Sequence, residues 1–296
     1  MNSQKIPRSF GTHSGTFHAD EVTACSLLLL FNLIDHDKIV RSRDPIKLAP
    51  SEYLCDVGGI YDPEQLLFDH HQAGYQGKLS SAGMILLYLY KQNKITQEEY
   101  DFLNQSLVKG VDEHDIGIAP QLPGYAYFSH IVANFAPINY DSTEEEQNEA
   151  FSQALQFVYG HLSRLWKRYQ YTKGCRELVA KCMEESSEVL MFDRELPWLE
   201  NFFALGGEHH PAKFVIMPAG KHWKLRGIPP SLSDRMNVRI PLPETWGGLL
   251  QEQLSQASGI KGAIFCHKGR FISVWETKED VLKALDYTLN YARRRE

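Results

Sequence analysis

The sequence contains no apolar run long enough to cross a membrane. The longest run, from Cys25 to Ile34, covers about ten residues, whereas a membrane-spanning helix needs about 20. The first ten residues, MNSQKIPRSF, also lack the apolar segment of a signal peptide. We therefore expect a protein without a membrane partner, in which Cys25 to Ile34 forms part of a buried helix.

Cysteine is scarce, and two familiar sequence patterns are missing. The five cysteines include no Cys-x-x-Cys pair, are odd in number and lie mostly in apolar sequence. This argues against a disulfide framework and predicts reduced thiols in a cytoplasmic protein. The chain shows no internal repeat, and its early glycines are not followed by the Gly-Lys-Ser/Thr of a phosphate-binding loop.

Composition and charge indicate a globular protein with two parts. With 43% apolar and 23% charged residues over 296 positions, the chain can bury a sizeable core. This length exceeds that of most single domains, so we expect two. Residues 201–296 hold 14 Lys/Arg and 9 Asp/Glu, a formal +5, which leaves −11 for the first 200 residues. An acidic first part suits cation binding, whereas a basic last third suits an anionic partner.

A first cluster of potential metal ligands follows a predicted strand at residues 8–12. In GTHSGTFHADE, small residues allow a tight turn that presents His13, His18 and Asp20 together. The apolar stretch from Ala19 to Ile34 is hydrophobic nearly all round, which predicts a helix packed between two layers. This arrangement favours half of a metal site. The alternative is a helix capped by Asp20 beside two incidental histidines.

Two further polar clusters follow predicted buried strands. The second is Asp56, after the apolar Tyr53 to Cys55, and the third is the run Asp69-His70-His71, after Leu66 to Phe68. Because ligand sites in open α/β sheets lie at the carboxyl ends of strands, we expect these clusters to converge. The alternatives are a helix-capping role for Asp56 and a solvated loop for the Asp-His-His run.

A fourth cluster ends the first third of the chain. Residues 79–92 predict a helix that begins at Ser80 or Ser81, and its amide end could bind an anion such as phosphate. A second helix, capped at Thr96, ends in a polar group made of Asp112, Glu113, His114 and Asp115. Together with a strand around Val40, these patterns predict a doubly wound, mostly parallel α/β domain with its polar groups along one edge.

The remainder of the chain has a different pattern. Residues 120–145 are rich in Pro, Tyr and acids and are expected to form a linker or surface excursion. From 144 to about 190, apolar residues recur at three- and four-residue steps, which predicts a helical connector. Short strands within 213–220, 222–229 and 262–275 accompany helices near 248–257 and 279–294. We expect a catalytic domain over residues 1–140 and, over 141–296, the connector with a second, smaller α/β domain that binds substrate.

The donors of the first domain suit a pair of divalent cations. Two neighbouring ions need about eight to ten ligand contacts, with one carboxylate shared between them. The candidate ligands are His13, His18, Asp20, Asp56, His70 and either Asp112 or Asp115. This mixture of nitrogen and oxygen donors suits Mn²⁺, with Zn²⁺, Fe²⁺ and Mg²⁺ as alternatives. Water held between two ions is poised to attack phosphorus, while His71 and the amides of Ser80 and Ser81 could bind the phosphoryl oxygens.

Four segments, in this order and spacing, resemble the motifs of the DHH phosphoesterase superfamily: HSGTFHAD, CDVGG, FDHH and VDEHD. From about Phe10 to Val281, the chain is also similar to the melanocyte-proliferating-gene family of DHH-like exonucleases, as seen in VRSRDP, DVGGIYDPE, FDHHQAGY, LSSAG and GIKGAIFCHKGRF. The resemblance implies hydrolysis of phosphodiesters in RNA or another nucleic acid. It implies that Asp56 bridges two metal ions, that His70 is a ligand and His71 contacts substrate, and that Asp112 is the fourth-motif residue.

The sequence departs from the superfamily in two places. Its first motif reads H-x4-H-x-D in place of H-x3-D-x-D, so that the neutral His18 replaces an anionic ligand. The glycine-rich nucleic-acid loop of many relatives is not plainly present. The segment around His267, Lys268 and Arg270 is the first candidate substitute, and Gly206 to His210 is a weaker one. Arg41 and Arg43 could contact phosphate, but a solvated strand end is the favoured interpretation.

Three functions remain open from the sequence. The first is a nuclease or exonuclease on nucleic acid, preferably RNA, in which Asp56, Asp69 and His71 act in catalysis. The second is a hydrolase of small phosphates, such as pyrophosphate or short oligonucleotides, at the same site. The third is a metal-binding scaffold without catalysis. The basic last third favours the first function, and homo-oligomer formation is left open.

Overall fold

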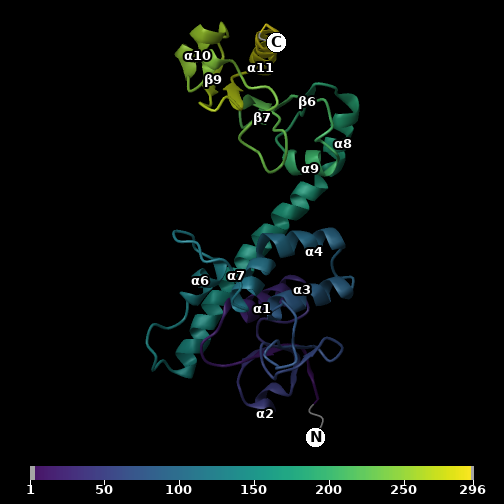
Figure 1. The fold of residues 1–296 in the computed structure, drawn as a ribbon, viewed down its shortest axis with the longest axis vertical. Coiled ribbons are helices and arrows are strands. Elements are labelled where there is room, and N and C mark those ends of the chain that lie inside the picture. The colour runs from purple at the N-terminus through teal and green to yellow at the C-terminus, as the bar shows by residue number, and fades with distance from the viewer. Residues whose placement is uncertain (1–3, 295–296) are drawn as a thin grey trace. The chain divides into compact units, whose positions relative to one another are not determined.

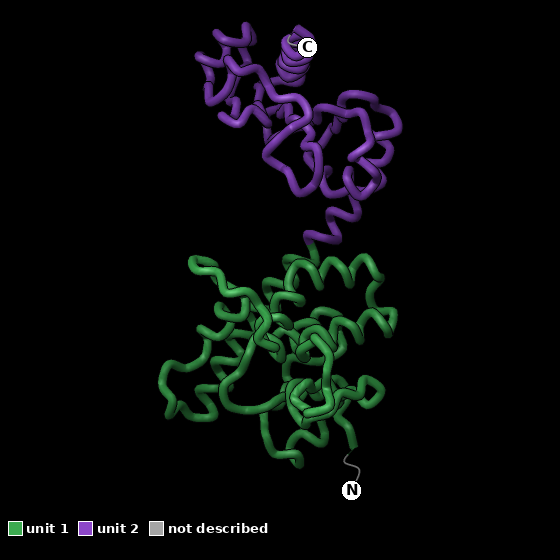
Figure 2. The backbone as a smooth tube through the Cα atoms, in the orientation of Figure 1, with its two compact units in different colours: residues 1–167 green, residues 168–296 purple. Residues whose placement is uncertain are grey.

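The computed structural model of the chain describes residues 4–294 and divides into two compact units (Figure 2), residues 1–167 and 168–296. The division falls inside helix α7 (Glu144–Gly174), in the segment expected to connect two domains. The assignment of separate roles to residues 1–140 and 141–296 stays a prediction.

The first unit is built on a five-stranded sheet in the order β2-β1-β3-β5-β4. The strands are β1 (Ile6–Thr12), β2 (Ile39–Arg41), β3 (Ser51–Cys55), β4 (Tyr61–Asp62) and β5 (Leu67–Phe68). All pairs are parallel except β4 with β5, which agrees with the mostly parallel sheet predicted. The chain winds outward from β1 in both directions, so the carboxyl ends of β1 and β3 flank the point where strand order reverses. Open α/β sheets bind ligands at this point.

Helices and a short π-helical turn complete the first unit (Figure 1). They are α1 (Ala19–Leu30), α2 (Pro45–Leu48), α3 (Ser81–Lys91), α4 (Gln97–Leu103), η1 (Asn104–Val108), α5 (Lys109–Asp115), α6 (Phe128–Ala133) and most of α7. Helices α1 and α3 lie side by side in one core. Nearly every residue of α1 is buried, as its all-round apolar sequence predicts. Both helices begin close to the strand ends, which brings their first residues to the same edge of the sheet.

Two expectations about the middle of the chain need correction. The segment at 120–145 is not irregular throughout, because residues 128–133 form α6 and bury Val132. The helical stretch predicted from 144 to about 190 is present as α7 and α8 (Arg176–Glu185), separated at Cys175, but it ends at Glu185, and Val189 begins a strand. Gly174 ends α7, and glycine has among the lowest helix propensities, which favours a break there.

The second unit contains its own five-stranded sheet in the order β6-β7-β8-β10-β9. The strands are β6 (Val189–Met191), β7 (Phe214–Ala219), β8 (His222–Gly227), β9 (Ala263–Cys266) and β10 (Ile272–Trp275), and only β6 and β7 pair in parallel. Around it lie α8, α9 (Leu199–Ala204), η2 (Glu244–Trp246), α10 (Gln251–Ser258) and α11 (Lys278–Arg293). Trp246 and Trp275 pack edge to face in its core. This confirms the predicted second α/β unit.

No helix within residues 4–294 is both long and apolar enough to span a bilayer. All five cysteines are free thiols, and four of them are buried. The cytoplasmic location stays a prediction.

Candidate metal centre

Asp56 follows β3 and occupies the strand-end position expected of it. Its backbone has φ 55°, a left-handed conformation that Asp and Asn adopt more readily than other residues with side chains. The residue is only 4% exposed. Its Oδ2 lies 3.2 Å from His13 Nε2, and its Oδ1 lies 3.3 Å from both His70 Nε2 and His71 Nδ1. One buried carboxylate is thus shared by histidines that follow two other strands.

The turn between β1 and α1 places His13 between two carboxylates. Besides Asp56, His13 Nε2 lies 3.2 Å from Oε1 of the fully buried Glu21. Both carboxylate oxygens of Glu21 accept the backbone N–H of His18, at 2.9 and 3.0 Å, and so cap the first turn of α1. The rings of His13 and His18 are 5.7 Å apart. Glu21 was not among the ligands predicted from the sequence, although a glutamate three residues after a helix-capping position was a usable signal.

Asp69 orients neighbouring residues of the site through hydrogen bonds. Its Oδ2 accepts the N–H of Gly59 at 2.6 Å, and its Oδ1 accepts the N–H and Nδ1–H of His71 at 3.0 and 2.9 Å. The bond from Nδ1 to Asp69 places a proton on Nδ1 of His71 and fixes the orientation of its ring. The side chain of His71 is 62% exposed, whereas that of His70 is 10% exposed.

The structure separates Asp112 from Asp115, which the sequence left as alternatives. Asp115 Oδ2 lies 3.2 Å from His70 Nε2, and its carboxylate lies within 4.8 Å of donor atoms of His18 and Asp20. Asp112 instead faces the start of α3, where its Oδ1 accepts bonds from Ser80. Asp115 therefore joins the cluster around Asp56, and Asp112 anchors a helix.

The expected phosphate-binding role of Ser80 and Ser81 does not agree with their surroundings. Both residues are fully buried. The amide of Ser80 donates to Asp112 at 3.0 Å, and the amide of Ser81 donates to Asp20 at 3.3 Å. Carboxylates of the chain itself thus occupy the positive end of α3, so a phosphoryl group has no access to it.

Burial and the short distances between the carboxylates shift the pKa values of the cluster. Burial, and then Asp56 and Glu21, raise the pKa of Asp20 well above its usual value, and burial also raises that of Asp115. Burial raises the pKa of Asp56 as well, but its contacts with His13 and His70 outweigh this and hold it below the usual range. For His13, burial lowers the pKa, yet Asp56 and Glu21 raise it to about 10. Positive charge at this point relieves the repulsion between the carboxylates.

The donor set fits divalent metal ions. Three groups have ligand atoms within 4.8 Å of one another: His13 with His18, Glu21 and Asp56; Asp56 with His70 and His71; and His18 with Asp20 and Asp115. Oδ1 of Asp20, Oδ1 of Asp56 and Nε2 of His70 are buried and make no hydrogen bond within the described part of the chain. The last two atoms are 3.3 Å apart, but their orientation does not suit a hydrogen bond. Buried polar atoms are normally hydrogen-bonded, so three that converge without such bonds are suited to hold an ion.

A pocket of about 430 Å³ is lined by five residues of the cluster, His18, Asp20, His70, His71 and Asp115, and by Ala19, His114, Ile116, Ser129 and Ala133. His114 and His130 lie ring to ring, with centroids 4.7 Å apart. His114 belonged to the predicted fourth cluster, whereas Ser129 and His130 lie in α6, which the sequence did not predict.

The basic residues predicted to bind substrate are spread over both units. Arg43 Nη2 lies 3.3 Å from His13 Nδ1, at the metal cluster. Arg41, for which a solvated strand end was the favoured interpretation, is instead 8% exposed and packs on Phe151. The other three, in the second unit, belong to the turn between β9 and β10: His267, Lys268 and Arg270.

The chain is similar to known proteins over most of its length. A family model described as "Uncharacterised protein family (UPF0160)" matches residues 9–289. The chain is 52% identical over 289 residues to the "MYG1 protein" of Chlamydia trachomatis, covering 98% of this chain and 99% of that protein. It is 34% identical over 325 residues to the "MYG1 exonuclease" of Homo sapiens, covering 96% and 86%. Among solved structures, RecJ with Mn²⁺ from Thermus thermophilus aligns at a TM-score of 0.31 and 15% identity, over 97% of this chain and 52% of that one.

Proposed function

This chain belongs to the uncharacterised protein family UPF0160, and from that premise we propose that it is a metal-dependent phosphodiester hydrolase of the exonuclease kind. The name "MYG1 exonuclease", carried by its human relative, supports an exonuclease. The single observation that carries the proposal is the position of Asp56, whose two oxygens face His13 on one side and His70 on the other. We further propose that the chain is a member of the DHH superfamily, on the strength of its four motifs.

In this proposal Asp56 would help to hold two divalent cations. His13 and His18 would serve as ligands for one ion, and Asp20, His70 and Asp115 would serve for the other, each set completed by Asp56. Asp115 replaces Asp112 as the fourth-motif ligand. Glu21 holds His13 in place, since it contacts His13 from within the core. The mixture of imidazole and carboxylate donors favours Mn²⁺ among the candidate ions.

The bound ions would activate water near neutral pH and neutralise charge on the phosphodiester. The chain's own residues would do the positioning. His71, whose Nδ1–H is held by Asp69, lines the pocket, and its Nε2 can contact a phosphoryl oxygen of the substrate. Arg43, at the other side of His13, can contact a neighbouring phosphate. Asp69 acts through His71 as a positioning residue and does not touch substrate.

We propose nucleic acid, with RNA favoured, as the substrate, and residues 1–140 as the catalytic domain. The turn between β9 and β10, with its exposed Lys268, would bind the chain of phosphates. Replacing Lys268 and Arg270 by alanine should weaken binding of long RNA while sparing a small chromogenic phosphodiester. Equal loss on both substrates would contradict a binding role for this turn. Lys261→Ala with Lys283→Ala, two basic residues elsewhere in the second unit, is the matched control.

Hydrolysis of small phosphates at the same metal centre is the second candidate, since the pocket of about 430 Å³ would admit a dinucleotide or pyrophosphate. The dependence of substrate affinity on salt concentration distinguishes the two candidate functions. Affinity for a long nucleic acid bound through many phosphates falls steeply as salt rises, whereas that for a small substrate falls much less.

The direct test is a screen of purified protein against RNA, DNA, dinucleotides and pyrophosphate, with Mn²⁺ added and with EDTA. We expect stepwise release of nucleoside monophosphates from RNA in Mn²⁺ and none in EDTA. Turnover that persists in EDTA, or no turnover of any phosphodiester, would reject the proposal.

A further inference from the structure

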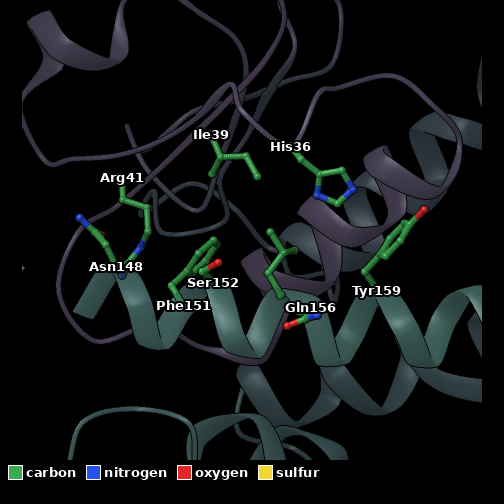
Figure 3. A pocket seen from close by; sticks show the side chains of 9 residues that line it. His36, Ile39, Arg41, Asn148, Phe151, Ser152, Gln156 and Tyr159 are labelled. Carbon is green, nitrogen blue, oxygen red and sulfur yellow. The ribbon is translucent and has the colours of Figure 1, made fainter. Parts of the chain in front are cut away.

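A second pocket lies in the first unit (Figure 3). It has a volume of about 650 Å³, within the range of roughly 300–1,000 Å³ that is typical of small-molecule sites. It lies between one side of α7 and the chain around β2, and its lining is formed by His36, Ile39 and Arg41 together with Asn148, Phe151, Ser152, Leu155, Gln156 and Tyr159. It shares no lining residue with the pocket at the metal centre.

Arg41, at one end of this pocket, carries a buried positive charge without a matching carboxylate. It is 8% exposed, and within residues 4–294 no carboxylate lies at ion-pair distance from it. Its Nη1 donates at 3.0 Å to the carbonyl of Gln147 and to Oδ1 of Asn148, and its Nη2 donates to the carbonyl of Gly15. Its Nε has no hydrogen-bond partner among the described residues.

Neutral partners do not fully compensate this charge. Glu21 and Glu144 act on Arg41 only from beyond ion-pair distance, and the ring of Phe151 lies 4.6 Å from its guanidinium carbon. Aromatic faces and carbonyl oxygens stabilise a cation in part, but a buried charge is usually paired with one of opposite sign. An anionic group at this end of the pocket would supply the missing partner, and guanidinium groups favour phosphates and carboxylates.

The rest of the lining suits a planar ring with polar edges. At the far end, His36 and Tyr159 stand edge to face with centroids 5.3 Å apart. Ile39 and Leu155 add apolar surface, and three polar side chains at the mouth could bond to a ring or a sugar, namely Asn148, Ser152 and Gln156. None of the described residues that line the pocket is acidic. From Asn148 to Tyr159 the helix rises by about 16 Å, which is enough length for a phosphate at one end and a base at the other.

We propose that this pocket is a second binding site, for a nucleoside monophosphate, with the phosphate at Arg41 and the base between Phe151 and Tyr159. The choice of a nucleotide among aromatic anions rests on the proposed function, because an exonuclease releases this class of molecule. The pocket itself does not depend on catalysis. Arg41 also bonds to Gly15, in the turn that carries His13, so a bound nucleotide would contact the residue that joins α7 to the metal turn.

The test measures binding to the full chain in EDTA, which separates the pocket from the metal reaction. Calorimetry with AMP, adenosine and inorganic phosphate is performed on the wild type and on Asp56→Asn. We expect saturable binding of AMP, with Kd roughly 0.01–1 mM for a ligand of this size, unchanged in Asp56→Asn. Adenosine and phosphate should each bind at least tenfold more weakly.

Two pocket variants and one control locate the site. Arg41→Gln should lose at least tenfold in AMP affinity, since it removes the positive charge. Because a change at the buried Arg41 can also impair folding, a second variant, Ser152→Trp, fills the mouth of the pocket from an exposed position of α7. Gln153→Trp, the exposed neighbour on the same helix that lies outside this pocket, should bind AMP as the wild type does.

Several outcomes would overturn the proposal. They are an absence of saturable AMP binding, equal binding of adenosine, equal binding of phosphate, or full AMP affinity in folded Ser152→Trp. A chain that binds AMP as expected but hydrolyses no phosphodiester would reject the proposed function and leave the pocket standing. A chain that hydrolyses phosphodiesters but does not bind AMP would reject only the proposed binding site.

Discussion

Replacing Asp56 with asparagine removes the negative charge that three histidines share and changes little else. Asparagine has nearly the same shape and also accepts the left-handed backbone, φ 55°, that Asp56 adopts. His13 lies 3.2 Å from this carboxylate and His70 lies 3.3 Å from it, and the side chains of Asp56, His13 and His70 are at most 10% exposed. The variant therefore tests the charge of the site without a backbone change.

The expected magnitudes follow from burial. Breaking a buried ion pair costs about 3–5 kcal/mol, an upper bound here because His13 can lose its proton. A domain of this size loses about 2–4 °C in Tm per kcal/mol, so the metal-free variant should melt lower than the wild type but remain folded at room temperature. Residues that only orient a ligand cost about 10–100-fold in metal affinity or activity. Loss of the shared ligand Asp56 should reduce activity by more than this range. Asp69→Asn, which releases His71, should reduce activity by an amount within it.

The assay combines metal analysis with hydrolysis of RNA and of a chromogenic phosphodiester in Mn²⁺. We expect Asp56→Asn to retain no stoichiometric metal and to lose more than about 100-fold in turnover. Asp69→Asn should keep its metal. Asp37→Asn, an exposed position of the same unit, is the matched control and should behave as wild type. Full metal content and activity in Asp56→Asn would refute the shared-carboxylate assignment.

Three further predictions concern the groups around this site. Glu21→Gln should keep the cap on α1 but weaken Mn²⁺ binding by about 10–100-fold, and an unchanged titration would exclude support of His13 by Glu21. Gly83→Ala should destabilise the chain by roughly 1–3 kcal/mol in denaturant, because its Cβ would lie 2.1 Å from Asp112 Oδ2, whereas Gly110→Ala, with no neighbour within 4 Å, should not. In EDTA, the Tm should fall as pH rises from 6.5 to about 10, because the raised pKa of His13 gives stability that is complete below 6.5 and lost through 10. A Tm that rises over this window would contradict the charge of His13, and Mn²⁺ should abolish the fall by displacing the proton.

The metal donors that follow strands were predictable because parallel strands impose a rule. His13, Asp56 and His70 follow β1, β3 and β5, whose carboxyl ends meet at one edge. No distance between them can be read from the sequence, but the alternation of strands and helices is sufficient to bring them to the same edge. The mostly parallel first sheet was predictable for the same reason.

The choice between Asp112 and Asp115 was not predictable, because both lie on α5, less than one turn apart. Which of them faces His70 depends on how α5 packs beside α1 and α3. The packing turns Asp115 toward the strand ends and Asp112 toward Ser80. The spacing of the motif does not reveal how α5 is rotated about its own axis.

The burial of Arg41 shows a second reason why sequence analysis could not predict every feature of the structure. A strand-end arginine followed by Ser42, Arg43 and Asp44 has the sequence pattern of a solvated side chain. Asn148 and Phe151 of α7 nevertheless bury Arg41 from more than 100 positions away. Contacts between segments so far apart are set by the tertiary fold. The pocket beside Arg41 was hidden from sequence analysis for that reason.

Anomalous diffraction from Mn²⁺-loaded crystals tests the shared-carboxylate centre most directly. We expect two manganese peaks on either side of the Asp56 carboxylate, one beside His13 and His18 and the other beside Asp20, His70 and Asp115. A single peak remote from Asp56, or no peak in crystals of protein that hydrolyses phosphodiesters, would contradict a metal pair held by Asp56.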